Sequence, residues 1–219
     1  MNKRLNACLS YLKDINTLMD VGTDHAYLPI EAVKQGLVKK VYAIDNKKGP
    51  LMLAEENIKK YGLEEQIEAV LASGIEALKE DVDAVVIAGM GGKMIHDILN
   101  LQSFQNVKRF ILQPNNHPQL VRMLTKTNQL KIMDEMIVVD QNIPYNIIVL
   151  EKGEQTLCDR SLWISDILFE RRDEEYKKML EEEYAFLINL LETVPGDARL
   201  PLEKKRDLLK EVFDEWHKG

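Results

Sequence analysis

Short apolar runs alternate with helix-like stretches between residues 17 and 128 of this chain. The runs are TLMDVG, VYAID, IEAVLA, DAVVIAG and RFILQP, and the helix-like stretches run to about residue 35 and over about 50–61, 92–100 and 118–128. Strands that alternate with helices predict right-handed βαβ crossovers and a mostly parallel sheet. The runs are almost continuously apolar, which is typical of strands covered by helices on both faces. Residues 1–13 predict a short amphipathic helix that precedes this α/β sheet, with Leu5, Leu9 and Leu12 on one face.

The pattern changes after the fifth strand. Residues 131–140 and 144–152 predict two consecutive strands joined by the short connection Gln141-Asn142-Ile143. A terminal β-hairpin on a parallel sheet differs from dinucleotide-binding dehydrogenases, which usually continue with another βαβ unit.

The C-terminal part reads as a separate helical region. Residues 159–192 have helical spacing of apolar side chains, Val194-Pro195-Gly196 is a turn signal, and a second helix is expected over about 199–217. The two helices predict an αα-hairpin or short coiled coil, either as a structural flap on the sheet or as an appendage that contacts a partner. We therefore expect two domains, residues 1–154 and 155–219.

Composition narrows the class of protein. The net charge is −7, and residues 154–219 carry most of it, with 11 Lys+Arg against 17 Asp+Glu. No apolar run approaches the roughly 20 residues that span a bilayer, and the N-terminus lacks the pattern of a signal peptide, so we expect a cytoplasmic protein without membrane contact. Cys8, Cys158 and the four histidines are scattered, which argues against a metal site.

Polar residues follow the first strand in the segment 20–25, Asp-Val-Gly-Thr-Asp-His. Ligands of α/β sheets bind outside the carboxyl ends of the strands. The dinucleotide fingerprint needs three glycines, and here only Gly22 is present. Asp20 and Asp24 would repel a pyrophosphate but suit a cation such as S-adenosylmethionine, which carries a sulfonium and an ammonium. The alternative is a plain strand-to-helix turn with Asp as helix N-cap.

The next two strand ends extend this pattern. Asp45 ends the second strand, where a carboxylate can accept both ribose hydroxyls of a nucleoside; otherwise it is a solvated loop residue. The third strand ends at Ala72-Ser73-Gly74, near the adenine ring in this architecture, unless Ser73 only caps a turn. The first three strand ends thus predict a nucleoside site.

Glycines and amides follow the last two parallel strands. The fourth ends in Ile87-Ala88-Gly89-Met90-Gly91-Gly92, whose glycines would let backbone approach a ligand or target base. Many amino-methyltransferases have N/D-P-P-Y here, so its absence argues against exocyclic amine transfer by that route. The fifth ends in Gln113-Pro114-Asn115-Asn116-His117, whose amides could read a base edge, or in which Asn116 or His117 caps the next helix.

These motifs resemble a known family, the bacterial tRNA adenine-N1 methyltransferases that modify position 22. The resemblance is carried by DVGTDHAYLPIEAVKQG (20–36), Gly49-Pro50, Asn57, VDAVVIAGMGG (82–92), ILQPN (111–115) and the hairpin segment 144–149. It implies a Rossmann-like class I methyltransferase domain with S-adenosyl-L-methionine as cofactor, followed by a C-terminal coiled-coil hairpin. Asp45-Asn46-Lys47-Lys48 departs from the family pattern next to the ribose contact.

The resemblance also implies roles for individual residues. The expected cofactor-binding residues are Asp20, Gly22, Thr23, His25, Leu28, Asp45, Asn46, Ala72, Ser73, Gly74, Ala88, Gly89, Met90 and Gly91. The expected substrate-binding residues are Gly92, Gln113, Pro114, Asn115 and Tyr145. Adenine N1 attacks without prior deprotonation, and the methylated base is cationic, so Asp24 is the expected catalytic carboxylate, with His25 orienting it or the methionine moiety.

The expected partner is tRNA, whose target base would be turned out of its stack into the site. Basic residues that could contact the RNA backbone, or be ordinary solvated surface, are Lys3, Arg4, Lys47, Lys48, Arg171, Arg172, Lys177 and Lys178. We expect a monomer. The competing interpretations are a methyltransferase of the same fold acting on a small molecule or protein, a non-enzymatic nucleic-acid-binding protein, and, more distantly, an NAD dehydrogenase.

Overall fold

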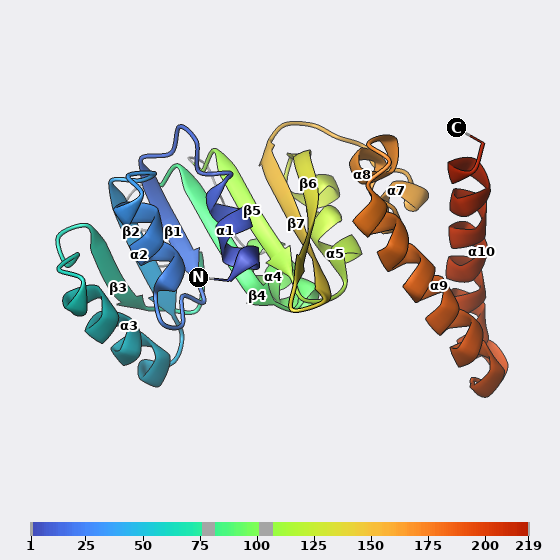
Figure 1. Ribbon diagram of the computed structural model, residues 1–219, viewed down its shortest axis with the longest axis horizontal. Helices are drawn as coiled ribbons and strands as arrows, with labels where there is room; N and C mark the ends of the chain where they lie inside the picture. Colours follow the sequence, from blue (N-terminus) through green and yellow to red (C-terminus); the bar gives the residue numbers. More distant parts are fainter. Residues whose placement is uncertain (1, 76–81, 101–106, 219) are drawn as a thin grey trace. The chain divides into compact units, whose positions relative to one another are not determined.

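The computed structural model describes residues 2–75, 82–100 and 107–218. Its centre is a seven-stranded sheet in the order β3-β2-β1-β4-β5-β7-β6 (Figure 1). The strands are β1 (Thr17–Val21), β2 (Lys40–Asp45), β3 (Ile67–Leu71), β4 (Ala84–Met90), β5 (Arg109–Pro114), β6 (Leu130–Asp140) and β7 (Ile143–Lys152). The first five are parallel, and β7 pairs antiparallel with both β5 and β6. The predicted parallel sheet with a terminal hairpin is confirmed.

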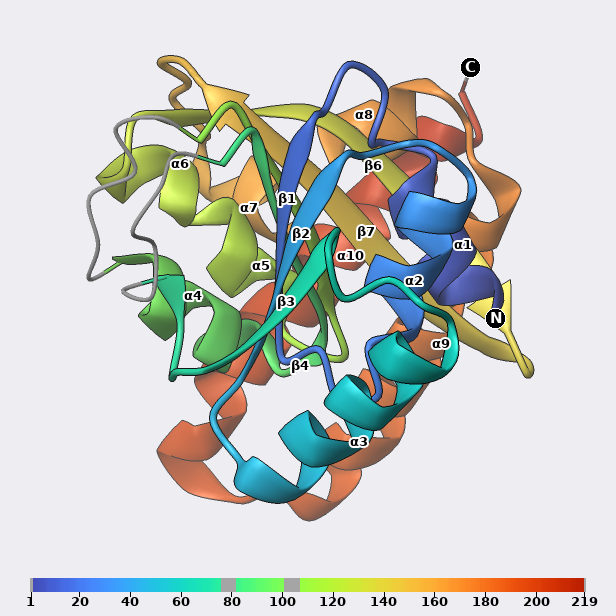
Figure 2. The same cartoon turned by 90° about the vertical axis from the view of Figure 1, so that its left-hand side faces the viewer.

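Helices cover both faces of this sheet. Figure 2 shows α1 (Lys3–Leu9), α2 (Tyr27–Lys34) and α3 (Lys48–Lys60) on one face, and α4 (Gly92–Asn100), α5 (Pro118–Arg122) and α6 (Leu124–Thr127) on the other. Side chains alternate between the two resulting cores, as the period of two in a strand requires. In β1, Leu18 packs in the core under the first three helices, whereas Met19 packs in the core under the others.

Two details of this unit differ from the expectation. The helix expected over 118–128 is two short helices, because the Thr125 hydroxyl donates to the Arg122 carbonyl at 2.8 Å and the chain tightens to an i→i+3 bond from Lys126 N to Met123 O. The hairpin connection has only two residues, Gln141 and Asn142, both with positive φ. That turn matches the twist of the flanking strands, so the expected third residue, Ile143, belongs to β7.

A buried ion pair joins α5 to β6. The Arg122 side chain donates to Glu135 at 3.0 Å from Nε and at 2.7 Å from Nη2, and the two side chains are 1% and 2% exposed. This bidentate geometry satisfies both charges in a setting where an unpaired one would be costly.

The chain divides into two compact units, Met1–Leu157 and Cys158–Gly219. Gln155 belongs to the first unit, because its side-chain oxygen accepts from the backbone N–H of Ile132 in β6 at 2.7 Å. Within the parts of the chain described above, no helix is both long and apolar enough to cross a membrane.

The second unit is helical, and its last two helices form the expected αα-hairpin (Figure 1). Its elements are α7 (Asp159–Trp163), α8 (Asp166–Glu170), α9 (Glu174–Thr193), the 3₁₀ turn Gly196–Ala198 and α10 (Arg199–Trp216). The stretch 159–192, expected to be uniformly helical, is broken twice. The Ser165 hydroxyl caps α8 by accepting from Leu168 N, and the Asp173 carboxylate caps α9 by accepting from Tyr176 N.

Candidate functional site

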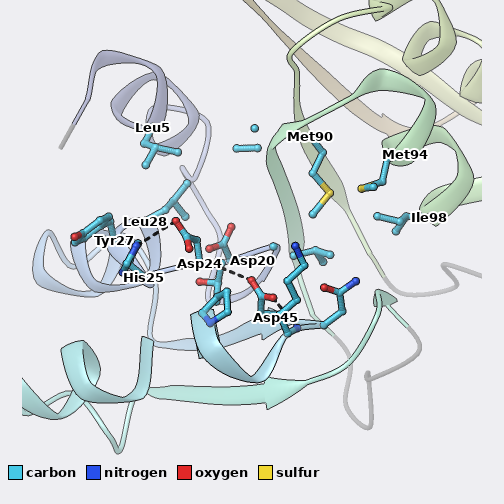
Figure 3. Close-up of a pocket in the computed structure, with 18 of the residues that line it drawn as sticks. Leu5, Asp20, Asp24, His25, Tyr27, Leu28, Asp45, Met90, Met94 and Ile98 are labelled. Carbon is cyan, nitrogen blue, oxygen red and sulfur yellow. Dashed lines mark hydrogen bonds and ion pairs between the residues drawn. The ribbon is translucent and has the colours of Figure 1, made fainter. Parts of the chain in front are cut away.

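A cavity of about 720 Å³ opens at the carboxyl ends of β1, β2, β3 and β4 (Figure 3). That volume lies in the range of small-molecule and cofactor sites. The lining residues are Arg4, Leu5, Asp20, Val21, Gly22, Thr23, Asp24, His25, Tyr27, Leu28, Asp45, Asn46, Lys47, Pro50, Ala72, Ser73, Ala88, Gly89, Met90, Met94, Ile98 and Asn115. Every parallel strand except β5 thus ends on the cavity, and Asn115 follows β5.

Three carboxylates make the cavity acidic. Asp20 and Asp45 are 5% and 8% exposed, whereas the Asp24 side chain is 65% exposed. The Asp45 carboxylate already accepts two backbone hydrogen bonds, from Asp24 N at 3.2 Å and from Lys47 N at 2.9 Å. Each oxygen of Asp45 keeps a further acceptor site, so the side chain can still receive hydroxyl donors.

Burial raises the pKa of two groups, Asp20 in the floor of the cavity and Cys8 of α1. Desolvation raises the pKa of the Asp20 carboxyl to about 7, and the neighbouring Asp45 charge acts in the same direction. Cys8 of α1 is fully buried, and burial together with the Asp20 charge raises the pKa of its thiol to about 12. A cation bound against Asp20 would replace the lost solvation of its charged form.

The segment between β1 and α2 has an unusual backbone. Gly22, Asp24 and Ala26 have φ of 77°, 53° and 56°, so alternate residues are left-handed. Ile44 O of β2 accepts from both Gly22 N and Thr23 N, which holds the segment over the second strand. The N-cap of α2 is Ala26, without a side-chain cap, so the alternative that Asp24 serves as the helix N-cap is wrong.

His25 and Asp24 lie beside each other at the rim (Figure 3). The His25 Nε2 is 3.5 Å from Asp24 Oδ2, and its ring stacks on Tyr27 with centroids 5.3 Å apart. The backbone carbonyl of His25 accepts from Asn57 Nδ2 of α3 at 3.0 Å. The imidazole is therefore close enough to contact the Asp24 carboxylate, and the expected orienting role of His25 stays a prediction.

The glycine string after β4 serves the packing of the chain itself. A Cβ at Gly92 would lie 2.3 Å from the His117 carbonyl oxygen, and one at Gly91 would lie 3.2 Å from Asn116 Oδ1. Gly92 N also donates to Asn116 O at 3.0 Å. Gly91 and Gly92 do not line the cavity, and their lack of a side chain lets the loop after β5 dock on the start of α4. Contact of these two glycines with a ligand or base stays a prediction.

The residues after β5 form a hydrogen-bonded brace. Gln113 is fully buried, accepts from Gly89 N at 3.0 Å and donates to Asn115 Oδ1 at 3.3 Å. Asn115 Nδ2 donates to Gly89 O at 2.7 Å. Pro114 is buried, and His117 occupies the N-cap position of α5 without a side-chain capping bond. Of this group only Asn115 reaches the cavity.

The cavity therefore gathers most of the expected cofactor residues and few of the expected substrate residues. Asp24 and all the expected cofactor residues except Gly74 and Gly91 line it, whereas Gly92, Gln113, Pro114 and Tyr145 do not. Residues 76–81, where a cap by Ser73 would show, lie outside the described residues.

Several lining residues were not expected as site residues. They are Arg4, Leu5, Val21, Tyr27, Lys47, Pro50, Met94 and Ile98, of which Arg4 and Lys47 were considered only as RNA contacts. Met94 and Ile98 are four apart on α4, so the helix periodicity after β4 was a usable signal for them. Arg4 and Leu5 reach the cavity only because α1 packs beside β6 and β7, which no local pattern reveals. The described residues include no group of three or more His, Cys, Asp or Glu side chains that could hold a metal ion.

Comparison with known proteins gives consistent matches over nearly the whole chain. Residues 18–216 match the family model described as tRNA (adenine(22)-N(1))-methyltransferase. The Bacillus subtilis protein of that name is 27% identical over 98% of this chain and 97% of its own.

Solved structures agree with this match. A Streptococcus pneumoniae protein in complex with S-adenosyl-L-methionine is 34% identical, with a TM-score of 0.89 over 97% of this chain and 99% of its own. The Mycoplasma capricolum protein TrmK in complex with S-adenosyl-homocysteine is 26% identical, with a TM-score of 0.90 over 98% of both chains.

Proposed function

The chain belongs to the tRNA (adenine(22)-N(1))-methyltransferase family, and we propose that the cavity at the carboxyl ends of β1–β4 is its active site. The activity of the family is S-adenosylmethionine-dependent methylation of adenine N1 in tRNA, and it is the activity of this chain. The observation that carries the site assignment is an acidic cavity at the strand ends, built without a glycine-rich phosphate cradle.

The residues in the cavity fit the cofactor. When bound, S-adenosylmethionine supplies a methyl group on a sulfonium sulfur. Asp20 offers a carboxylate to its cationic groups, and Asp45 offers the remaining acceptor sites of its oxygens to ribose hydroxyls. Ala72 and Ser73, which follow β3, and the apolar Ile98 of α4 would hold its adenine.

Asp24 is proposed as the catalytic carboxylate. Adenine N1 uses a lone pair in the ring plane, so no proton has to be removed before it attacks. The base becomes positively charged as the new N–C bond forms, and a nearby carboxylate stabilises that charge. Asp24 supports this role because its side chain is exposed to the cavity and His25 lies 3.5 Å from it.

We further propose that the second unit and basic residues of the first bind the tRNA, and that the target base is turned out into the cavity. The basic candidates of the second unit are Arg171, Arg172, Lys177 and Lys178. We propose two domains, a methyltransferase domain and the helical hairpin. We also propose a monomer located in the cytoplasm, because tRNA is a cytoplasmic substrate.

The test is methyl transfer from labelled S-adenosylmethionine to unmodified tRNA, followed by identification of the modified nucleoside. Label in N1-methyladenosine at position 22, absent when that adenine is replaced by guanine, supports the proposal. Cofactor binding without transfer to any tRNA would instead assign the site to a small-molecule or protein acceptor. Loss of transfer in the Asp24→Asn variant, with retained cofactor affinity, tests the assignment of the site.

A further inference from the structure

Arg4 is held at the mouth of the cavity by a rigid helix. The N-cap side chain of α1, Asn2, accepts from Leu5 N at 2.9 Å, and Cys8 and Leu9 of the same helix are buried. Helix α1 is therefore fixed at both ends. Arg4 lies in its first turn, and the Arg4 side chain lines the cavity together with Leu5.

Contacts from two other elements aim its guanidinium. The Arg4 Cζ lies 5.3 Å from the centroid of the Tyr145 ring of β7, and Nη1 donates to Asn115 Oδ1 at 3.4 Å. A Cβ on Gly89 would lie 3.2 Å from Arg4 Nη1, so the end of β4 makes room for the group. The positive φ of 83° at Gly89 independently favours glycine there.

The orientation of Asn115 is set by hydrogen bonds that start from the buried Gln113. Gln113 Oε1 accepts from Gly89 N, so its amide nitrogen must face Asn115 Oδ1. Asn115 Nδ2 in turn donates to Gly89 O. The oxygen of Asn115 is thereby presented to Arg4, and the guanidinium is the outermost member of a brace that begins in the core of the sheet.

The guanidinium keeps most of its hydrogen-bonding capacity. A guanidinium has five N–H donors, and within residues 2–75, 82–100 and 107–218 Arg4 uses one of them and forms no ion pair with a carboxylate. A cation with open donors at the mouth of an acidic cavity suits an anionic oxygen group that approaches from outside. Phosphodiesters match this planar fork of donors well.

We propose that Arg4, positioned by Tyr145 and Asn115, binds the phosphodiester beside the target adenine and so sets where the base enters the cavity. This inference rests on the proposed function, because the anion belongs to the tRNA. It assigns the β5–β7 side of the mouth to the RNA backbone and leaves the acidic β1–β2 side to the cofactor.

The first test compares Arg4→Gln with Lys39→Gln. Lys39 is an exposed cation at the amino end of β2, the opposite end from Asp45, so its variant makes the same charge change away from the cavity. We expect Arg4→Gln to lower kcat/KM for tRNA about tenfold or more at moderate salt. Its slope of log kcat/KM against log salt should become shallower by about 0.7–0.9, the value for one lost phosphate contact. Lys39→Gln should change neither.

The second test separates the RNA backbone from the cofactor. S-adenosylmethionine also carries a carboxylate, so its affinity for each variant is measured by calorimetry without RNA. An unchanged cofactor affinity in Arg4→Gln supports the phosphodiester. A loss of cofactor affinity that accounts for the whole loss of kcat/KM, or an unchanged salt slope, overturns the inference. Wild-type protein that methylates no tRNA would instead overturn the proposed function.

The role of Tyr145 is tested by ring-keeping and ring-removing variants. Tyr145→Phe keeps the face under the guanidinium and should retain the wild-type salt slope. Tyr145→Leu removes it and should move the slope toward that of Arg4→Gln. The Arg4→Gln/Tyr145→Leu double variant should lose little more than Arg4→Gln alone. Additive losses would show that Tyr145 does not position Arg4.

Discussion

Cofactor affinity should depend on pH through Asp20. The carboxyl is buried in the cavity floor and its pKa is raised to about 7 by desolvation. A cationic ligand binds best to the ionised form. With that pKa the ionised fraction is roughly one tenth at pH 6 and nine tenths at pH 8, so the contribution of Asp20 to affinity should fall about tenfold between pH 8 and pH 6.

Asp20→Asn is the matched variant, because it keeps the shape and removes the titration. Calorimetric binding of S-adenosylmethionine is measured for both proteins at pH 6, 7 and 8 in buffers of equal ionic strength. Titration of the cofactor's own amino group contributes equally to both proteins. The difference between the two proteins therefore isolates Asp20. An equal pH dependence in wild type and variant would refute the reasoning.

The same raised pKa has a consequence for stability. The native state holds the Asp20 proton up to about pH 7, whereas the unfolded chain releases it near the ordinary pKa of 3.8. The native state binds more protons between these values, so the free energy of unfolding falls as the pH rises through that window. At about 1.4 kcal/mol per pKa unit, the loss at pH 8 is at most about 4 kcal/mol. Asp20→Asn should therefore melt higher than wild type at pH 8, as followed by circular dichroism.

Three further changes test other features. Asp24→Asn should lower single-turnover methyl transfer by about tenfold or more while cofactor affinity stays within a few-fold, because the lost charge acts on the cationic base; equal losses in both would reassign the residue. Gly92→Ala should destabilise the protein in urea more than Gly62→Ala, since its Cβ would lie 2.3 Å from a backbone oxygen whereas Gly62 has only its φ of 66° to strain. Arg122→Met should cost about 3–5 kcal/mol of unfolding free energy by leaving Glu135 buried and unpaired. The Arg122→Met/Glu135→Leu double variant should recover most of that loss, and no recovery would contradict the assigned role of the pair.

The parallel sheet was predictable because its strands are short, apolar and separated by helix signals. The same periodicity did not reveal the breaks in the C-terminal region. Ser165 and Asp173 each begin a helix, and both belong to residue types that favour N-caps, so their signals were present but weaker than the apolar spacing around them. The length of the turn at Gln141-Asn142 was misjudged because positive φ is uncommon at non-glycine residues and the turn lacks the glycine that usually signals a two-residue hairpin.

Most residues that line the cavity were predictable from strand ends, since parallel strands bring their carboxyl ends to one edge. The surroundings of the expected substrate residues were less predictable. Gly92 fits a close approach of backbone, and Gln113 braces Gly89 from the core. Arg4 depends on the packing of α1 against distant strands, which only tertiary structure supplies.

Asp45 has a thermodynamic consequence that follows from its two backbone partners. Its Oδ2 holds the amide of Asp24, and its Oδ1 holds the amide of Lys47. A ribose bound to this carboxylate would therefore depend on Asp45, and so does the segment that carries Asp24. Binding in either half of the cavity would then change the affinity of the other half. Linkage makes such coupling reciprocal. If bound cofactor raises the affinity for tRNA by some factor, bound tRNA must raise the affinity for the cofactor by the same factor.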